Sequence, residues 1–180
     1  MQLKSKAIAL SGIFGALALL VMLCGNLLPF AEYLCPALAG MLILPVVCEA
    51  GKRTGWLFYA GISVLSLLIL PDKEPAFLFA ALLGYYPLLR FTLEKLRPFV
   101  LRLLVKLAVF NTAVTLVYTL MLHLFGFEAL QQEMAEMAGG ALLLLLVLAN
   151  ITFLVYDLAV YRLFLAYRKL LRPRILKGLR

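Results

Sequence analysis

The chain alternates between long apolar runs and short polar segments, and this pattern predicts a set of membrane-spanning helices. The first run extends from Ala7 to Leu28 and contains no charged residue. A helix of this length rises roughly 33 Å at about 1.5 Å per residue, enough to cross a hydrocarbon core of about 30 Å. Lys4 and Lys6 precede the run. Because basic residues favour the cytoplasmic side, we expect the N-terminus to lie in the cytoplasm.

Further apolar runs follow, and together they predict an all-α bundle of six transmembrane helices with both termini cytoplasmic. The second run contains Pro36, Gly40 and Pro45, which predict a broken or kinked helix. Of the 17 Lys and Arg residues, only Lys73 falls in a predicted outer turn, and this asymmetry supports six crossings. The predicted helices cover residues 7–28, 34–48, 56–70, 76–89, 99–125 and 141–165 of one transmembrane domain, residues 1–180.

The composition agrees with a multi-pass protein of the cell membrane. The chain is 65% hydrophobic and only 14% charged, with a mean hydropathy of +1.04, whereas soluble domains are about 45–50% apolar. The net charge of +8 comes from basic residues between and after the apolar runs. The topology rule for cytoplasmic loops accounts for them, so the bilayer is the expected partner and nucleic acid is not.

Motifs for catalysis, metal binding or nucleotide binding do not occur in the sequence. The chain has one histidine and lacks HExxH, GxSxG, CxxC and Walker patterns. We therefore expect no enzyme, no cofactor and no metal site, and any active transport needs an energised partner. Cys24, Cys35 and Cys48 have no ligand spacing and are interpreted as small packing residues.

Small residues recur on one side of the first predicted helix. Ser11, Gly12, Gly15 and Ala16 are three or four residues apart, so they share a helix face. Helices in lipid associate closely over small residues. This face is a candidate docking surface for a partner membrane protein; the alternative is packing against the protein's own helices.

Two of the charged residues in the last two predicted helices, Lys106 and Asp157, lie about two turns from the inner helix ends. Lys106 and Asp157 lie at similar distances from the inner ends of their helices, so antiparallel neighbours would bring them together. We expect an ion pair that either fixes the helix register or acts as a proton or coupling relay. Asn111 and Asn150 show the same symmetry near the midplane, as a helix–helix contact or as the floor of a substrate site.

A second polar group is expected at the outer ends of the helices. Its members come from helix ends and from the outer turns, and they could line a pocket for a small organic solute. The alternatives are a packed helix end for the histidine and a solvated turn for the charged triplet. The candidate residues are Asn26, Glu32, Tyr33, Asp72, Lys73, Glu74, Tyr118 and His123.

The layout and two local patterns resemble the substrate-binding S component of energy-coupling factor (ECF) transporters. The first pattern is Ala9-Leu-Ser-Gly12-Ile-Phe-Gly15-Ala16-Leu. The second is Pro36-Ala-Leu-Ala-Gly40-Met-Leu-Ile-Leu-Pro45, followed by Gly51-Lys52-Arg53. The resemblance covers most of the chain, with its six helices and cytoplasmic ends.

This resemblance implies a mode of action and a set of partners. S components capture a vitamin or similar micronutrient from outside, and a membrane T component with two cytoplasmic ATPases drives its release inward by toppling the S component. The family carries an Ala-x-x-x-Ala pattern on helix one that contacts the T component. The matching positions here are Gly12 and Ala16, or Ser11 and Gly15, with a glycine or serine in place of an alanine.

Two functions of other classes fit the same composition. A small MreD-like membrane scaffold would need no pocket, and its polar residues would serve packing. An autonomous carrier or channel would use Lys106, Asp157 and the midplane asparagines as its path. A dry interior holding a solute favours the S component, a packed interior the scaffold, and a continuous polar channel the carrier.

Overall fold

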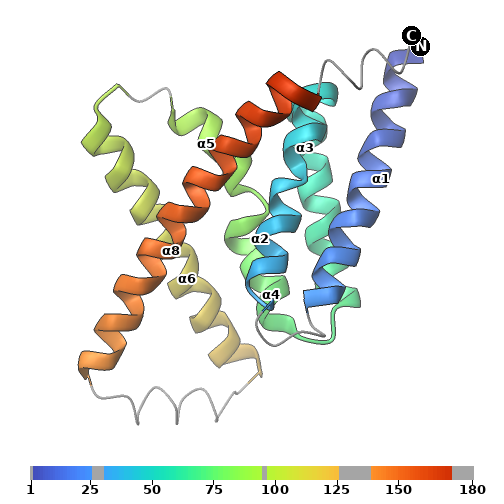
Figure 1. The fold of residues 1–180 in the computed structure, drawn as a ribbon. Helices are drawn as coiled ribbons and strands as arrows, with labels where there is room; N and C mark the ends of the chain where they lie inside the picture. The colour runs from blue at the N-terminus through green and yellow to red at the C-terminus, as the bar shows by residue number, and fades with distance from the viewer. Residues whose placement is uncertain (1, 26–30, 95–96, 126–138, 172–180) are drawn as a thin grey trace.

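The computed structural model describes residues 2–25, 31–94, 97–125 and 139–171, and the regular secondary structure of these residues is entirely helical (Figure 1). This confirms the all-α prediction. The elements are α1 (Gln2–Gly25), α2 (Leu34–Met41), α3 (Ile43–Ile69), α4 (Lys73–Leu78), the π-helix η1 (Phe79–Leu83), α5 (Tyr86–Leu93), α6 (Phe99–Phe125), α8 (Gly139–Ala166) and the π-helix η2 (Tyr167–Leu171).

Several helices have the length and composition of membrane spans. The bent pair α2 and α3, which meet at 45°, makes one further span if the two are counted together. By these criteria the described chain has four or five spans, and it has the character of a membrane protein. The four straight candidates are Ile8–Gly25, Lys73–Leu93, Phe99–His123 and Leu143–Lys169.

The broken helix expected around the prolines of the second apolar run is present. α2 ends at Met41 and α3 begins at Ile43, so the break falls at Leu42. Pro45 causes this geometry, since its ring occupies the space of the carbonyl four residues earlier, at Met41, and it has no N–H to donate to that carbonyl.

The chain folds back on itself inside α3, at Gly51. This glycine has φ 85° and ψ 169°, a backbone conformation outside the helical region. A Cβ on Gly55 would lie 2.5 Å from Val47 Cγ2, although residues eight apart along one straight helix are separated by about 12 Å. Residues 43–50 and 52–69 therefore pack side by side as two limbs, as Figure 1 shows. The second limb contains most of the helix predicted over residues 56–70.

The helix predicted over residues 76–89 is longer and irregular, because it consists of α4, η1 and α5. Pro87 leaves the carbonyl of Leu83 without its usual helical donor, and the Tyr156 hydroxyl of α8 donates to that oxygen at 3.0 Å. The N–H of Gly84 reaches back to the Phe79 oxygen at 2.8 Å, which widens the turn into a π-helix. α2 packs directly on this turn at Gly40, where a Cβ would lie 2.2 Å from the Leu83 oxygen.

Two packed clusters make up most of the core. One joins α1, α2 and both limbs of α3, around Met22, Ile43 and Phe58. The other joins α5, α6 and α8, where the rings of Phe110 and Phe153 stack with centroids 4.6 Å apart. α6 and α8 cross at this point (Figure 1), and their bounds agree with the predicted helices 99–125 and 141–165 to within two residues. The leucines near the start of α8 are exposed, as expected for side chains that contact lipid.

Candidate functional site

A buried charged cluster lies between α5, α6 and α8, centred on Asp157. Lys106 Nζ donates to Asp157 Oδ2 at 2.8 Å, so the two residues form the ion pair expected from their depths in the helices. The other oxygen, Oδ1, accepts from Arg90 Nε at 2.7 Å and from the Tyr86 hydroxyl at 2.6 Å. Both carboxylate oxygens are thus bonded, and one side chain connects three helices.

Glu94, at the end of α5, extends the cluster. Its Oε1 accepts from Arg90 Nη2 at 2.9 Å and lies 3.5 Å from Lys106 Nζ. Its Oε2 accepts from Arg102 Nη1 at 3.0 Å. Three cations and two carboxylates therefore share the cluster, which leaves a net charge of +1. The side chains of Arg90 and Lys106 are only 9% and 6% exposed, so these charges depend on one another rather than on water.

Sequence reasoning found only part of this cluster. The predicted helices 76–89 and 99–125 leave Arg90 and Glu94 in the segment between them, whereas the structure places them on and at the end of α5. A signal was available, because Tyr86, Arg90 and Glu94 are each four residues apart and such residues share a helix face. The assignment of Asp157 to one partner, Lys106, was therefore too simple.

The predicted outer group comes together in part, around Glu74. Its Oε1 accepts from the Tyr33 hydroxyl at 2.8 Å and from the Tyr118 hydroxyl at 3.0 Å. The carboxylate therefore connects α4, α6 and the turn before α2. Burial, with the negative charges of Glu74 and Asp72, raises the pKa of Glu32. Burial and the bond to Glu74 raise the pKa of Tyr33.

The other predicted outer residues have different surroundings. Lys73 Nζ donates to the carbonyl oxygens of Leu67 and Leu70, at 3.0 and 2.7 Å, so its charge caps the C-terminal end of α3. Asp72 and His123 are exposed, at a turn and in the last turn of α6. Asn26 lies outside the described residues.

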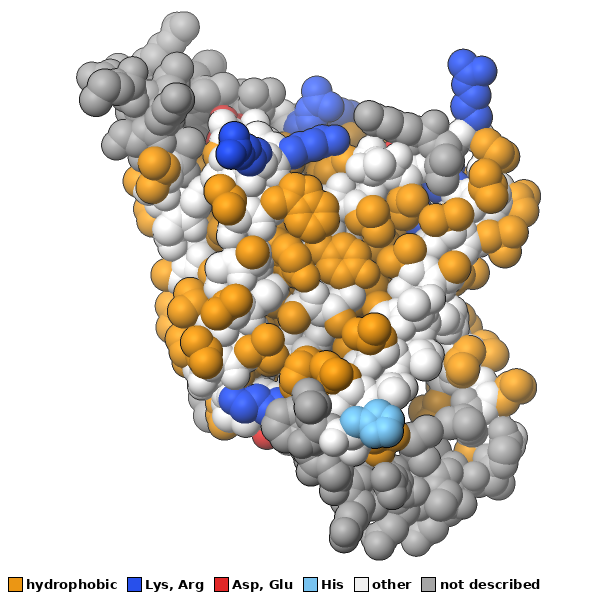
Figure 2. Space-filling model, turned by 180° about the vertical axis from the view of Figure 1, so that it is seen from behind, with side chains coloured by type: hydrophobic (Ala, Val, Ile, Leu, Met, Phe, Trp, Pro, Cys, Tyr) orange, Lys and Arg blue, Asp and Glu red, His pale blue; other side chains and the backbone are white. Residues whose placement is uncertain are grey.

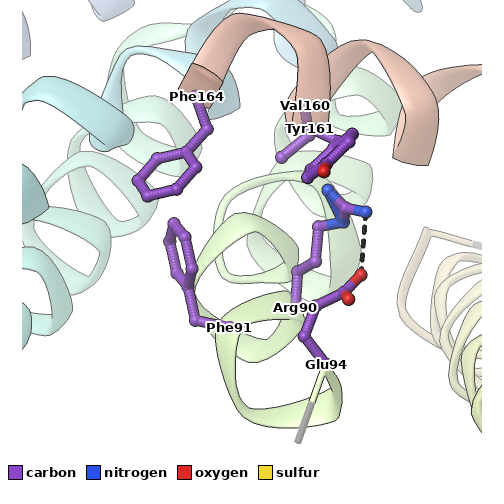
Figure 3. A pocket seen from close by; sticks show the side chains of 6 residues that line it. All are labelled: Arg90, Phe91, Glu94, Val160, Tyr161 and Phe164. Carbon is purple, nitrogen blue, oxygen red and sulfur yellow. Dashed lines mark hydrogen bonds and ion pairs between the residues drawn. The ribbon is translucent and has the colours of Figure 1, made fainter. Parts of the chain in front are cut away.

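Two hollows lie at the other end of the molecule, beside the charged cluster. One has a volume of about 240 Å³, and Arg90 spans part of it with its guanidinium 4.9 Å from the Tyr161 ring centroid (Figure 3). The second, of about 420 Å³, lies beside Gly51 and Lys52. Phe91 and Phe164 line both hollows, and their rings meet edge to face with centroids 4.7 Å apart. Neither hollow is lined by Glu74, Tyr33 or Tyr118, around which a solute pocket was expected.

The small-residue face of α1 is divided by the fold. Gly15 faces inward, where a Cβ would lie 3.2 Å from Ile62 Cδ1 and 3.5 Å from Phe58 Cε2. Gly12 and Ala16 are exposed, and a Cβ on Gly12 would meet no atom within 4 Å. Ser11 is partly buried. Internal packing thus uses Gly15, while Gly12 and Ala16 stay uncovered.

The midplane asparagines bond to each other across α6 and α8. Asn111 Nδ2 donates to Asn150 Oδ1 at 2.9 Å, and Asn150 Nδ2 donates back to Asn111 Oδ1 at 3.2 Å. Each amide also donates to the carbonyl four residues earlier in its own helix. This geometry is that of a helix–helix contact.

Within the described ranges, no three His, Cys, Asp or Glu side chains gather closely enough to hold a metal ion. The long apolar helices give the chain the character of a helical membrane protein. Comparisons of the chain with family models, with curated proteins and with solved structures found no match.

Proposed function

We propose that the chain is the substrate-capturing membrane subunit of an ECF-type importer. In this proposal it crosses the cell membrane six times with both termini in the cytoplasm. Support for six crossings comes from the reversal at Gly51, which divides α3 into two limbs. The six proposed crossings are then α1, the two limbs of α3, the α4–α5 stretch, α6 and α8.

The distribution of cations supports the proposed orientation. On the face shown in Figure 2, the Lys and Arg side chains gather mainly at the upper end, with hydrophobic side chains over the middle. Lys52 and Arg53 at the reversal, and Arg168 in η2, belong to the same end as the charged cluster. α4, which begins at Lys73, lies at the opposite end of the molecule in Figure 1. Under the positive-inside rule, the end rich in cations faces the cytoplasm and the Glu74 end faces outward.

The Glu74 end is the proposed capture site. Glu74, Tyr33 and Tyr118 come from three separate segments and present a carboxylate and two phenols together. Such a group can accept hydrogen bonds from a small organic solute and donate hydrogen bonds to it. A vitamin-like micronutrient is the substrate class that the family resemblance suggests.

The uncovered pair Gly12 and Ala16 on α1 is the observation that carries the proposal. These residues are one helical turn apart and exposed, so the backbone of α1 is open to close approach by another helix. The proposed occupant is the T component, which would couple the chain to two cytoplasmic ATPases. The sequence itself has no nucleotide-binding motif, and in this proposal the ATPases supply the energy for transport.

Enlarging this pair tests the docking role. The double variant G12L/A16L is expected to abolish co-purification of the T component, because two leucines would hold the partner helix away from α1. Co-expression with the T component and ATPases of the same organism, followed by affinity purification, measures this. The control is G61L, a single small-to-large change at an exposed position of α3, where an added Cβ would meet no atom within 4 Å. The docking role is excluded if G12L/A16L retains the T component as well as the wild type does.

An MreD-like scaffold is the second candidate. The observation that favours it is the buried ion cluster, whose carboxylates all have partners within the chain, as expected for a structural device. The two hollows described above also lie beside the ion cluster and Gly51, and neither is lined by Glu74, Tyr33 or Tyr118. A solute that co-purifies with the chain would exclude the scaffold.

A further inference from the structure

We propose that the hollow beside Gly51 binds one anionic phospholipid, with its phosphate between Lys52 and Arg168. This site is separate from the proposed capture site and from the α1 docking pair. It lies at the basic end of the molecule, where α3 reverses and where α8 continues into η2.

The cations of this hollow are available to an anion. Lys52 and Arg168 come from different elements, line the same hollow of about 420 Å³ and are exposed. None of the ion pairs between described residues involves either of them. Arg90, in contrast, is already bonded to Asp157 and Glu94. Lys52 and Arg168 therefore supply a positive potential to the hollow without an ion-pair partner among the residues that the structure describes.

The walls of the hollow suit a hydrocarbon chain. Val47, Phe91 and Phe164 give it apolar sides, and the two phenylalanines also line the neighbouring hollow of about 240 Å³. A Cβ on Gly51 would meet no atom within 4 Å, so the space reaches the backbone. Arg168 lies over the Phe164 ring, 5.6 Å from its centroid, which places a cation directly beside the apolar wall.

An amphiphile with a negative head fits this combination better than a soluble anion does. Basic pockets between transmembrane helices are a known way of holding phospholipid headgroups, and the cytoplasmic leaflet carries the anionic lipids. In the proposed orientation the hollow opens at that leaflet. A free phosphate would use the two cations but would leave the aromatic walls bare.

Quenching of the single tryptophan provides the test. Trp56 lies one turn after Lys52 on the same helix, so it reports on lipid at this site. The full chain is reconstituted in phosphatidylcholine bilayers that contain brominated phosphatidylglycerol or brominated phosphatidylcholine. The wild type is expected to prefer the anionic lipid, and removal of each cation is expected to lower this preference about fivefold.

Matched variants distinguish binding of the lipid at this hollow from a general attraction of anionic lipid to surface cations. K52Q/R168Q removes the two cations of the hollow, and R53Q/R162Q removes two exposed cations that do not line it. The proposal expects the preference to be lost only in K52Q/R168Q and retained in the charge-conserving K52R/R168K. An equal loss in both Gln variants would overturn it, as would a wild type without preference. Displacement of the brominated lipid by inorganic phosphate would overturn it as well. The elution volume of each variant in size-exclusion chromatography verifies folding.

Discussion

Replacing Asp157 with alanine is expected to lower the free energy of unfolding by about 3–5 kcal/mol, the range found when one partner of a buried ion pair is removed. The variant leaves Lys106 Nζ, Arg90 Nε and the Tyr86 hydroxyl without the acceptor that joins three helices. The buried charge of Lys106 is expected to account for most of this loss, because its remaining acceptor, Glu94 Oε1, is 3.5 Å away. Unfolding in mixed micelles of increasing denaturant content measures the change.

Two further variants test whether the loss of stability in D157A comes from breaking the ion cluster or would follow from the loss of any carboxylate. D72A removes an exposed carboxylate at a turn and is expected to change stability little. K106M/D157L removes both charges of the Lys106–Asp157 pair and is expected to cost less than the sum of the two single changes, because neither of these two charges is then left buried alone. Equal effects of D157A and D72A would show that the cluster does not hold α5, α6 and α8 together.

Replacing Gly40 with alanine is expected to destabilise the fold by about 3 kcal/mol, the upper part of the usual cost of overpacking. The new methyl group would lie 2.2 Å from the Leu83 oxygen and 2.9 Å from its carbonyl carbon. These are backbone atoms of the π-turn, so they cannot move aside as the end of a side chain can. α2 must shift away, which also disturbs the bond from the Tyr156 hydroxyl to Leu83.

Thermal unfolding followed by size-exclusion chromatography tests this expectation, with G61A as the matched control. Gly61 is also helical, but a Cβ there would meet no atom within 4 Å. G61A is expected to be neutral or stabilising by up to about 1 kcal/mol, because alanine has the higher helix propensity. A melting temperature for G40A equal to that of G61A would contradict the close packing of α2 on η1.

Much of the helical architecture could be predicted from the chain because apolar runs, prolines and basic turns act locally. α6 begins and ends where its apolar run does, and Pro45 places the break between α2 and α3. The similar distances of Lys106 and Asp157 from the inner ends of their helices also predicted their ion pair. These features depend on helix geometry alone, which the sequence spacing already contains.

The features that escaped prediction depend on tertiary packing. Arg90 has the appearance of a loop cation because charged residues and Pro98 follow it, and only the approach of α8 makes it a partner of Asp157. The aromatic wall between the hollows arises where Phe91 of α5 meets Phe164 of α8, far apart in sequence. Lys73 was expected at a solute site, but carbonyls at the end of α3 bind its ammonium group.

Native mass spectrometry of the gently solubilised chain, co-expressed with the T component and ATPases of its organism, tests the proposed function most directly. The proposal predicts one complex that contains the chain, the T component and two ATPase subunits, with the additional mass of a small bound molecule. That mass would also identify the substrate class. A chain that is released alone, without ATPases and without a bound solute, would contradict the importer assignment and favour the scaffold.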